Sequence, residues 1–178
     1  AGEIIGSIGM TEPGTGSDLK NIRTHAVRDG DDYVINGQKV WITNGFNCGV
    51  VLVACKTDPA AGAKGVSLIA VEEGTPGFSR SQPMDKIGLK AQDTAELFFD
   101  NVRVPASNLL GEEGRGFVYL MQQLAQERLV IAMRSTATLE HQLEQTIRYT
   151  TDRKVFGNPI IGFQNSKFKL AEAKAYIT

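Results

Sequence analysis

The stretch GDDYVINGQKVWIT, residues 30–43, decides the fold of the first half of the chain. It holds two runs of β-branched and aromatic residues, and such runs are typical of β-strands. Asn36-Gly37 stands between the runs and is the strongest short signal for a two-residue hairpin turn. We therefore predict a β-hairpin, with strands at residues 33–35 and 38–43.

Further strand signals lie on both sides of this stretch. From residue 4 to about residue 105, short apolar runs alternate with clusters of Gly, Asp, Asn and Pro. We expect strands at residues 50–54, 66–71 and 95–99, with a loop at residues 58–64. Six or more short strands predict a sandwich or barrel.

The pattern changes to a helical one after Pro105. Apolar residues recur at spacings of three and four, and Glu112 and Glu113 suit a helix start because the helix dipole favours acidic groups there. This stripe consists of Phe117, Leu120, Met121, Leu124, Ile131, Leu139, Leu143 and Ile147. We expect a long helix that ends near Phe156-Gly157 and a second helix over residues 163–178. The predicted fold class is α+β: a β domain over residues 1–106, either a sandwich or an antiparallel β-barrel, followed by two long helices over residues 107–178.

Two helices alone leave a flank of each apolar stripe open to water. Later helices or a second copy of the chain are expected to cover that flank. The first residue is not methionine and the final helical pattern has no cap, so we expect a fragment of a longer protein.

Composition excludes several classes of protein. Hydrophobic residues make up 42% of the 178 and charged residues 22%, which is typical of a soluble globular chain. Nineteen basic and 20 acidic residues give a net charge of −1, which provides no field for nucleic acid or an anionic membrane. Cys48 and Cys55 fit neither a disulfide framework nor a metal site, and no apolar run approaches a membrane span. We expect a soluble protein in a reducing compartment, without a metal.

Two segments could line a ligand. Residues 10–18 (MTEPGTGSD) place glycines and hydroxyls in a turn directly after a strand, where N–H and O–H groups can point at a ligand. On local composition alone, an ordinary Gly-Pro turn capped by Ser17 or Asp18 is the favoured alternative. Strand alternation puts Trp41 and Thr43 on one face, which could flank a flat ring system. The alternative is a tryptophan in the core.

Glu127 is the most informative single residue. Its spacing from Leu124 and Ile131 places a carboxylate where the helix stripe asks for a hydrocarbon. Burial raises a carboxylate pKa, which suits a general base near neutral pH. A glutamate in a surface salt bridge remains the alternative. Arg153 could bind a diphosphate, or it could simply interact favourably with the helix C-terminus.

Four separated blocks together resemble the acyl-CoA dehydrogenases. They are residues 10–18, residues 36–44 (NGQKVWITN), residues 86–97 (KIGLKAQDTAEL) continuing through residues 104–105 to residues 110–117 (LGEEGRGF), and residues 153–157 (RKVFG) with Gln164. Their order and length carry the resemblance over essentially the whole chain. The third block and Glu127 within residues 124–129 (LAQERL) are most similar to the long-chain and isovaleryl types.

The resemblance implies a middle β-barrel domain followed by the first helices of a C-terminal bundle, and FAD as cofactor. It implies that Glu127 is the catalytic base, that Ser17, Gln126 and Arg128 bind substrate, and that no metal is needed. The residues that it places at FAD are Ile8, Met10, Thr11, Ser17, Trp41, Ile42, Thr43, Arg153, Phe156 and Gln164, the last three at the FAD of a neighbouring subunit.

The reaction that the resemblance implies is FAD-dependent α,β-dehydrogenation of acyl-CoA to trans-2-enoyl-CoA. An electron-transfer flavoprotein would accept the electrons. The enzyme would be a homodimer or homotetramer, in the bacterial cytoplasm or the mitochondrial matrix. Two alternatives stay open: an acyl-CoA oxidase or other flavin enzyme on the same scaffold, and a catalytically silent, self-associating fragment.

Overall fold

The computed structural model describes residues 2–177 and divides into two compact units, residues 1–122 and residues 123–178. The first unit holds a β-sheet and the start of a long helix. The second holds the rest of that helix and a shorter one. The division between the two units therefore falls inside the long helix. The domain boundary that we expect at residues 106/107 stays a prediction.

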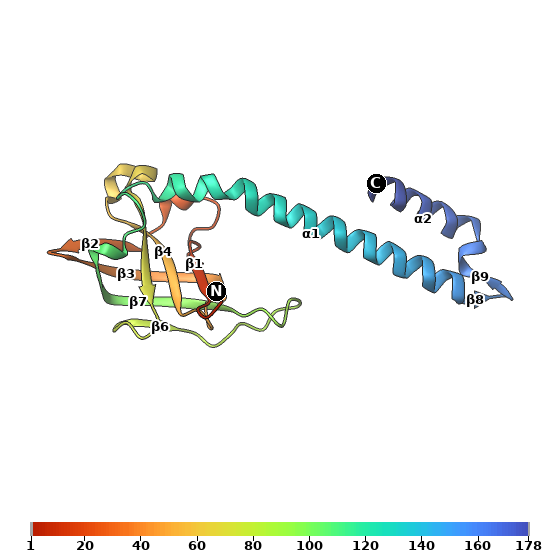
Figure 1. The fold of residues 1–178 in the computed structure, drawn as a ribbon, viewed down its shortest axis with the longest axis horizontal. Coiled ribbons are helices and arrows are strands. Elements are labelled where there is room, and N and C mark those ends of the chain that lie inside the picture. Colours follow the sequence, from red (N-terminus) through yellow and green to blue (C-terminus); the bar gives the residue numbers. More distant parts are fainter. Residues whose placement is uncertain (1, 178) are drawn as a thin grey trace. The chain divides into compact units, whose positions relative to one another are not determined.

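The first unit is built around seven strands in its described part (Figure 1). They are β1 (Gly6–Gly9), β2 (His25–Asp29), β3 (Asp32–Thr43), β4 (Val50–Lys56), β5 (Val66–Glu72), β6 (Phe78–Arg80) and β7 (Thr94–Pro105). Short 3₁₀ helices connect them at Leu19–Asn21 and Pro59–Gly65, and a third, Ala106–Asn108, follows β7. The strands expected at residues 50–54, 66–71 and 95–99 are confirmed as parts of β4, β5 and β7.

The strands form a mixed sheet in the order β1-β4-β2-β3-β7-β6, with β5 on the other edge of β4. It makes a half-barrel. The expectation of a wholly antiparallel barrel is wrong, because β1 pairs with β4 in parallel over its whole length and β2 pairs with β4 in parallel at His25 and Lys56. Parallel neighbours need a long connection. Residues 10–49, which include the β2–β3 hairpin, provide it between β1 and β4.

The predicted turn at Asn36-Gly37 is wrong, because β3 runs through this dipeptide without reversing. The register with β7 shifts there, and the Asn36 side-chain oxygen accepts a hydrogen bond from the Asn101 N–H at 2.8 Å. Gly37 has φ +149°, and a Cβ at this position would lie 2.4 Å from Thr24 Oγ1. The glycine permits a close approach between strands. The hairpin turn lies instead between β2 and β3, where Gly30 has φ +63°.

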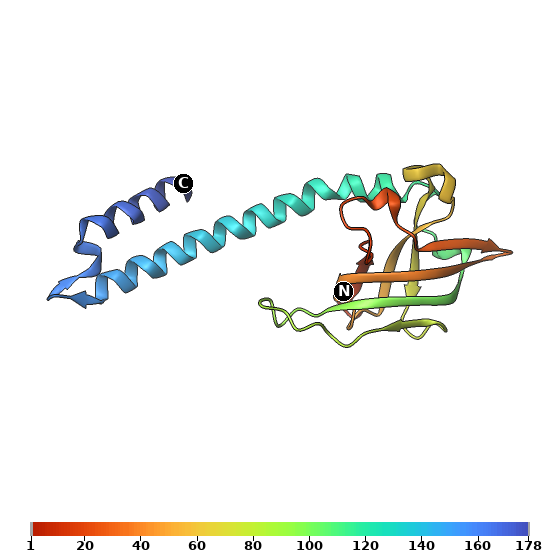
Figure 2. The same ribbon diagram turned by 180° about the vertical axis from the view of Figure 1, so that it is seen from behind.

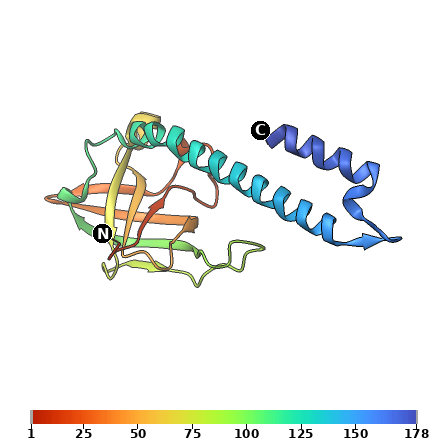
Figure 3. The same ribbon diagram turned by 45° about the vertical axis from the view of Figure 1, so that its right-hand side comes forward.

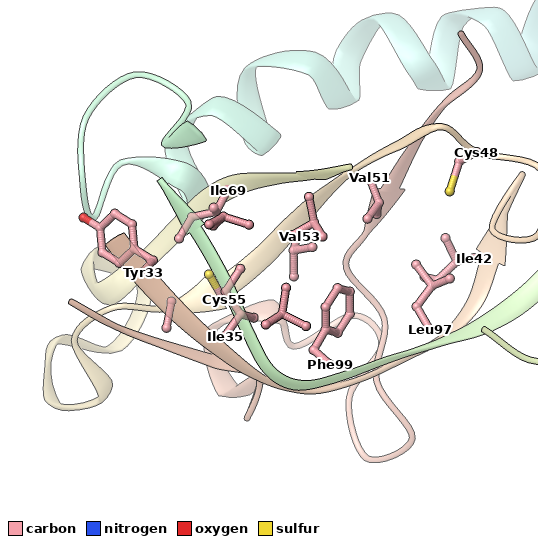
Figure 4. Packing of buried hydrophobic residues seen from close by; sticks show 14 residues of the cluster. Tyr33, Ile35, Ile42, Cys48, Val51, Val53, Cys55, Ile69, Leu97 and Phe99 are labelled. Atoms are coloured by element: carbon pink, nitrogen blue, oxygen red, sulfur yellow. The ribbon is translucent and has the colours of Figure 1, made fainter. Parts of the chain in front are cut away.

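The core of the first unit lies inside the half-barrel. Side chains of β3, β4, β5 and β7 point toward one another, with Val53, Ile69 and Leu97 fully buried (Figure 4). Both cysteines are buried and free. Burying an aliphatic side chain such as Val53, Ile69 or Leu97 contributes about 1.5–3 kcal/mol to the free energy of unfolding. A second apolar cluster joins Leu68 of β5 to Leu120 in the first turns of the long helix.

The long helix α1 (Gly116–Asp152) confirms the first helix that we expect, with different ends. Glu112 and Glu113 precede it, because Gly111 and Gly114 adopt positive φ values of 67° and 76° that hold this segment in a turn. Glu113 instead accepts a hydrogen bond from the buried Tyr33 hydroxyl at 2.9 Å.

The second helix α2 (Gln164–Ile177) confirms the helix that we expect over residues 163–178, as far as the structure describes it. With 14 residues it is much shorter than α1, so the expectation of two long helices is not met in the described part of the chain. A small hairpin of β8 (Lys154–Val155) and β9 (Asn158–Pro159), followed by a 3₁₀ turn at Ile160–Gly162, reverses the chain between α1 and α2 (Figure 3). Helix α2 then runs back beside the end of α1 (Figure 2). Leu143 and Ile147 of α1 and Ile177 of α2 line a shared pocket.

Half of the predicted apolar stripe of α1 is exposed. Only Leu120 and Leu143 among its eight members are buried, whereas Ile131 and Leu139 are 64% and 55% exposed. The expectation that these helices need further cover agrees with this exposure. No helix within residues 2–177 is both long enough and apolar enough to cross a membrane.

Candidate functional site

Residues 10–18 leave β1 and close into a hydrogen-bonded turn. The backbones of Glu12 and Thr15 bond to each other in both directions, at 2.9 and 3.1 Å. The Thr15 hydroxyl donates to the Asn21 carbonyl at 3.4 Å. Ser17 is exposed, and Asp18 makes no side-chain cap to the following 3₁₀ helix but accepts a hydrogen bond from the Asn21 amide. The turn is therefore held by its own backbone, which leaves the Ser17 hydroxyl available.

The end of β3 lies directly against this turn. The Val40 N–H donates to the Thr11 carbonyl at 2.9 Å, and the Ser7 hydroxyl donates to the Thr43 carbonyl at 2.8 Å. The two segments that the sequence singled out, separated by some thirty positions, are thus brought together in one unit.

Trp41 is not a core residue, so the alternative of a tryptophan packed in the interior is wrong. Its side chain is 63% exposed, whereas Val40 and Ile42 on either side of it are buried. Trp41 has φ +61° at a register irregularity between Lys39 and Ile42. An aromatic residue in this conformation is strained, and such strain is concentrated at functional sites.

Three of the predicted cofactor contacts have structural roles as well. Ile42 is 3% exposed and belongs to the main core. Ile8 and Met10 are half-buried and pack against the second apolar cluster. For Ile42, the buried side chain leaves only the backbone to meet a ligand.

The sequence reasoning missed an ion pair beneath the turn. Lys39 is fully buried, and its Nζ donates to Glu12 Oε1 at 2.8 Å and to the Met10 carbonyl at 3.0 Å. The Glu12 carboxylate also accepts hydrogen bonds from the N–H groups of Arg23 at 2.6 Å and Thr24 at 2.9 Å. The available signal was a lysine inside a predicted strand, directly followed by the apolar run Val40-Trp41-Ile42.

The environment shifts the pKa of both partners. Burial alone would raise the pKa of Glu12, but the hydrogen bonds from Lys39 and Arg23 and the Lys39 charge outweigh it and hold that pKa below its ordinary value. Burial lowers the pKa of Lys39, and the Glu12 carboxylate opposes that change. The close carboxylate stabilises the ammonium that burial disfavours.

Glu127 lies on α1 in the second unit, with Gln126 and Arg128 beside it, and all three are exposed. Within residues 2–177, Glu127 forms no ion pair, so the surface salt bridge offered as the alternative is absent there. The dry surroundings expected for a general base are not formed by the described chain. Glu127 as the base stays a prediction.

Arg153, Phe156 and Gln164 surround the reversal between the helices. Arg153 follows α1, and its carbonyl accepts a hydrogen bond from the Ile160 N–H at 2.9 Å. Phe156 sits at the tip of the β8–β9 hairpin with φ +51° and is 93% exposed. Gln164 opens α2 and is also exposed. The hairpin, which the sequence reasoning did not predict, therefore presents an aromatic ring and a guanidinium near one another in the chain.

The first-unit site can bind a flat, polar-edged ring. Trp41 offers an exposed aromatic surface, and the hydroxyls of Thr11 and Thr43 have no hydrogen-bond partner within the described part of the chain. Hydroxyls of this kind can donate to ring carbonyl and nitrogen atoms. In the same residue range, no group of three His, Cys, Asp or Glu side chains could hold a metal ion.

Comparison with known families accounts for both units. The family model described as "Acyl-CoA dehydrogenase, middle domain" matches residues 7–102, and the one described as "Acyl-CoA dehydrogenase, C-terminal domain" matches residues 114–178. The chain belongs to the acyl-CoA dehydrogenase family. The resemblance carried by the four sequence blocks is confirmed.

Relatives within the acyl-CoA dehydrogenase family agree in sequence and in fold. The long-chain specific acyl-CoA dehydrogenase of Sus scrofa mitochondria is 52% identical over 179 residues, which cover 99% of this chain and 42% of that protein. The isovaleryl-CoA dehydrogenase of Oryza sativa mitochondria is 42% identical over 172 residues, covering 97% of this chain and 42% of that protein. The crystal structure of an acyl-CoA dehydrogenase from Geobacillus kaustophilus superposes with a TM-score of 0.96 at 52% identity, over 98% of this chain and 47% of that chain. This chain thus spans less than half the length of these relatives.

Proposed function

We propose that this chain forms the central part of an FAD-dependent enzyme that dehydrogenates acyl-CoA thioesters to trans-2-enoyl-CoA. The observation that carries the proposal is the joining of Thr11 to the Trp41 segment by the 2.9 Å bond from the Val40 N–H. This bond unites the two sequence blocks that resemble the family's flavin-binding segments. The high identity with a long-chain dehydrogenase supports the same reaction.

The first unit fits an isoalloxazine ring. The exposed Trp41 would pack against the ring, and the unpartnered hydroxyls of Thr11 and Thr43 would donate to its polar edge. Ser17, exposed at the end of the same turn, would face the acyl-CoA. These residues orient the reactants, which is the protein's share of catalysis in a cofactor enzyme.

Glu127 would remove the proton α to the thioester carbonyl. Bound FAD would supply the hydride acceptor for the β-hydrogen. Gln126 and Arg128 neighbour Glu127 on α1 and would contact the substrate. A general base of this kind works best when water is excluded and its pKa lies near neutrality. We infer that parts of the protein beyond this chain, or a second subunit, enclose Glu127.

A neighbouring subunit would receive the β8–β9 hairpin. Arg153 would extend to the diphosphate of that subunit's FAD, Phe156 would pack on its ring systems, and Gln164 would contact the adenosine portion. The 93% exposure of Phe156 supports an external contact. The enzyme would therefore be a homodimer or homotetramer.

An electron-transfer flavoprotein would reoxidise the reduced enzyme. Curated relatives described as mitochondrial support a location in the mitochondrial matrix, with the bacterial cytoplasm as the equivalent in a bacterium. Two buried free thiols are compatible with either reducing compartment.

The deciding experiment is a visible spectrum of the purified full-length gene product, titrated anaerobically with acyl-CoAs of different chain length. A flavin spectrum that bleaches with at least one acyl-CoA supports the proposal. A colourless protein, or a flavin that no acyl-CoA reduces, would contradict it. Admitting oxygen afterwards separates an oxidase, whose flavin recovers its colour rapidly, from a dehydrogenase that needs an electron-transfer flavoprotein.

A further inference from the structure

We propose that Lys39 and Glu12 act as a positioning pair that sets the flavin-facing conformation of Thr11 relative to Trp41, an inference that rests on the proposed function. The pair lies beneath the turn and would not touch the cofactor. Its two contacts at the turn, the Met10 carbonyl and the Glu12 carboxylate, belong to the residues on either side of Thr11.

Three hydrogen bonds from β3 restrain the backbone around Thr11. Lys39 Nζ holds the Met10 carbonyl at 3.0 Å and Glu12 Oε1 at 2.8 Å. The Val40 N–H holds the Thr11 carbonyl itself at 2.9 Å. The hydroxyl of Thr11 is then the group left free to meet a ligand. Lys39 and Val40 are consecutive, so the same point of β3 sets all three distances.

Lys39 also stands at the start of the irregularity that exposes Trp41. The register of β3 against β7 shifts between Lys39 and Ile42, and Trp41 lies within that shift with φ +61°. A strained conformation persists only where its surroundings enforce it. The buried Lys39 ammonium, held by two acceptors on the turn, provides one such restraint two residues before Trp41.

Stability alone gives a poor account of this arrangement. Lys39 is 0% exposed and Glu12 is 6% exposed, so both charges are removed from water. A well-packed apolar pair is often as stable as a buried ion pair, or more so. Directed hydrogen bonds do what apolar contact does not: they hold two chain segments at one relative position. The N–H groups of Arg23 and Thr24 also donate hydrogen bonds to the Glu12 carboxylate.

The test uses the full-length gene product with the variants Lys39→Met, Glu12→Gln and the double variant Lys39→Met/Glu12→Gln. Methionine fills most of the volume of the lysine stem without a charge. The N–H groups of Arg23 and Thr24 bond to different oxygens of the Glu12 carboxylate, so the single glutamine oxygen can still accept from one of them. The matched control is Lys90→Met, which removes the ion pair with Asp85 from an exposed site where the two side chains are 65% and 92% exposed. The readouts are the melting temperature of the apoprotein, the dissociation constant of FAD and the visible spectrum of bound flavin.

We expect the double variant, which leaves no unpaired buried charge, to melt at a higher temperature than Lys39→Met, which leaves the Glu12 carboxylate buried without its partner. The double variant should still bind FAD at least tenfold more weakly than the wild type and show shifted flavin absorption bands. Lys90→Met should match the wild type in all three. If Lys39→Met does not fold, the double variant and Glu12→Gln are judged by the same measurements.

The inference is wrong if the double variant binds FAD as tightly as the wild type with an unchanged spectrum. It is equally wrong if FAD affinity recovers in every variant in which thermal stability recovers, since that is the behaviour of a purely structural pair. A yellow wild-type protein that acyl-CoA bleaches, combined with either result, leaves the proposed function intact. A wild-type protein that binds no flavin overturns both.

Discussion

Replacing Gly37 by alanine should destabilise the first unit strongly. The added Cβ would lie 2.4 Å from Thr24 Oγ1 and 2.7 Å from Thr24 Cα, both below any ordinary contact distance. The φ of +149° adds a conformational cost of about 1–3 kcal/mol for a residue with a side chain. Overpacking adds about 1–3 kcal/mol more, because the Thr24 backbone must move with its side chain. We expect a total loss of about 2–6 kcal/mol in the free energy of unfolding.

Urea unfolding followed by far-ultraviolet circular dichroism measures this loss. With a slope of about 1–3 kcal/mol per molar for a small protein, the midpoint should fall by roughly 1–2 M or more. Gly30→Ala is the matched control, because Gly30 also has a positive φ of 63° but nothing lies within 4 Å of a Cβ there. That variant should lose only about 1–2 kcal/mol. If the two variants lose the same stability, the close approach of Thr24 does not determine the residue at position 37.

Three further predictions concern single side chains. Glu127→Gln in the full-length gene product should lower the turnover number by about 10²–10⁴-fold with FAD still bound, and near-normal turnover would show that the base lies elsewhere. Burial raises the pKa of the Cys55 thiol to about 12, so iodoacetamide at mildly alkaline pH should alkylate it only in denatured protein, as mass spectrometry of the Cys55 peptide would report. The folded pKa of Glu12 lies below its ordinary value of 4.5, so its stabilisation is present above that value and is lost as the pH falls through the folded pKa. Between about pH 6 and about pH 3, the urea midpoint should therefore fall further for the wild type than for Glu12→Gln. Equal falls in the two proteins would refute the stabilising role of the ionised carboxylate.

The strands were predictable from local composition, whereas their pairing was not. The apolar run at residues 50–54 marks β4 because a strand buried between neighbours needs no polar alternation. Nothing in that run indicates that β1 and β2 both pair with it in parallel. The cue at Asn36-Gly37 failed for a related reason. A two-residue pattern describes local turn preference, but the distant Thr24 and Asn101 decide what these two residues do.

The candidate site was predictable where a residue type signals chemistry by itself. Trp41 is exposed, and the hydroxyls of Thr11 and Thr43 have no partner within residues 2–177, which agrees with side chains available to a ligand. Their contact with FAD stays a prediction. The ion pair of Lys39 with Glu12 escaped the sequence reasoning, because charged residues are rarely fully buried and the partners are 27 positions apart. Glu127 is exposed in the described chain, so the dry surroundings expected for it from the helix pattern are not found there.

Trp41 and Phe156 share two properties that together point to external contacts. Each is an aromatic residue with a positive φ, of 61° and 51°, and each is largely exposed, at 63% and 93%. The conformation costs roughly 1–3 kcal/mol, and the exposed ring recovers little of it by burial within the chain. An aromatic residue that is both strained at the backbone and exposed is best explained by a contact formed outside the described chain, with a ligand or another subunit. Leu89, with φ 53° and 56% exposure, meets the same two criteria within the block at residues 86–97, so the same reasoning predicts an external contact there.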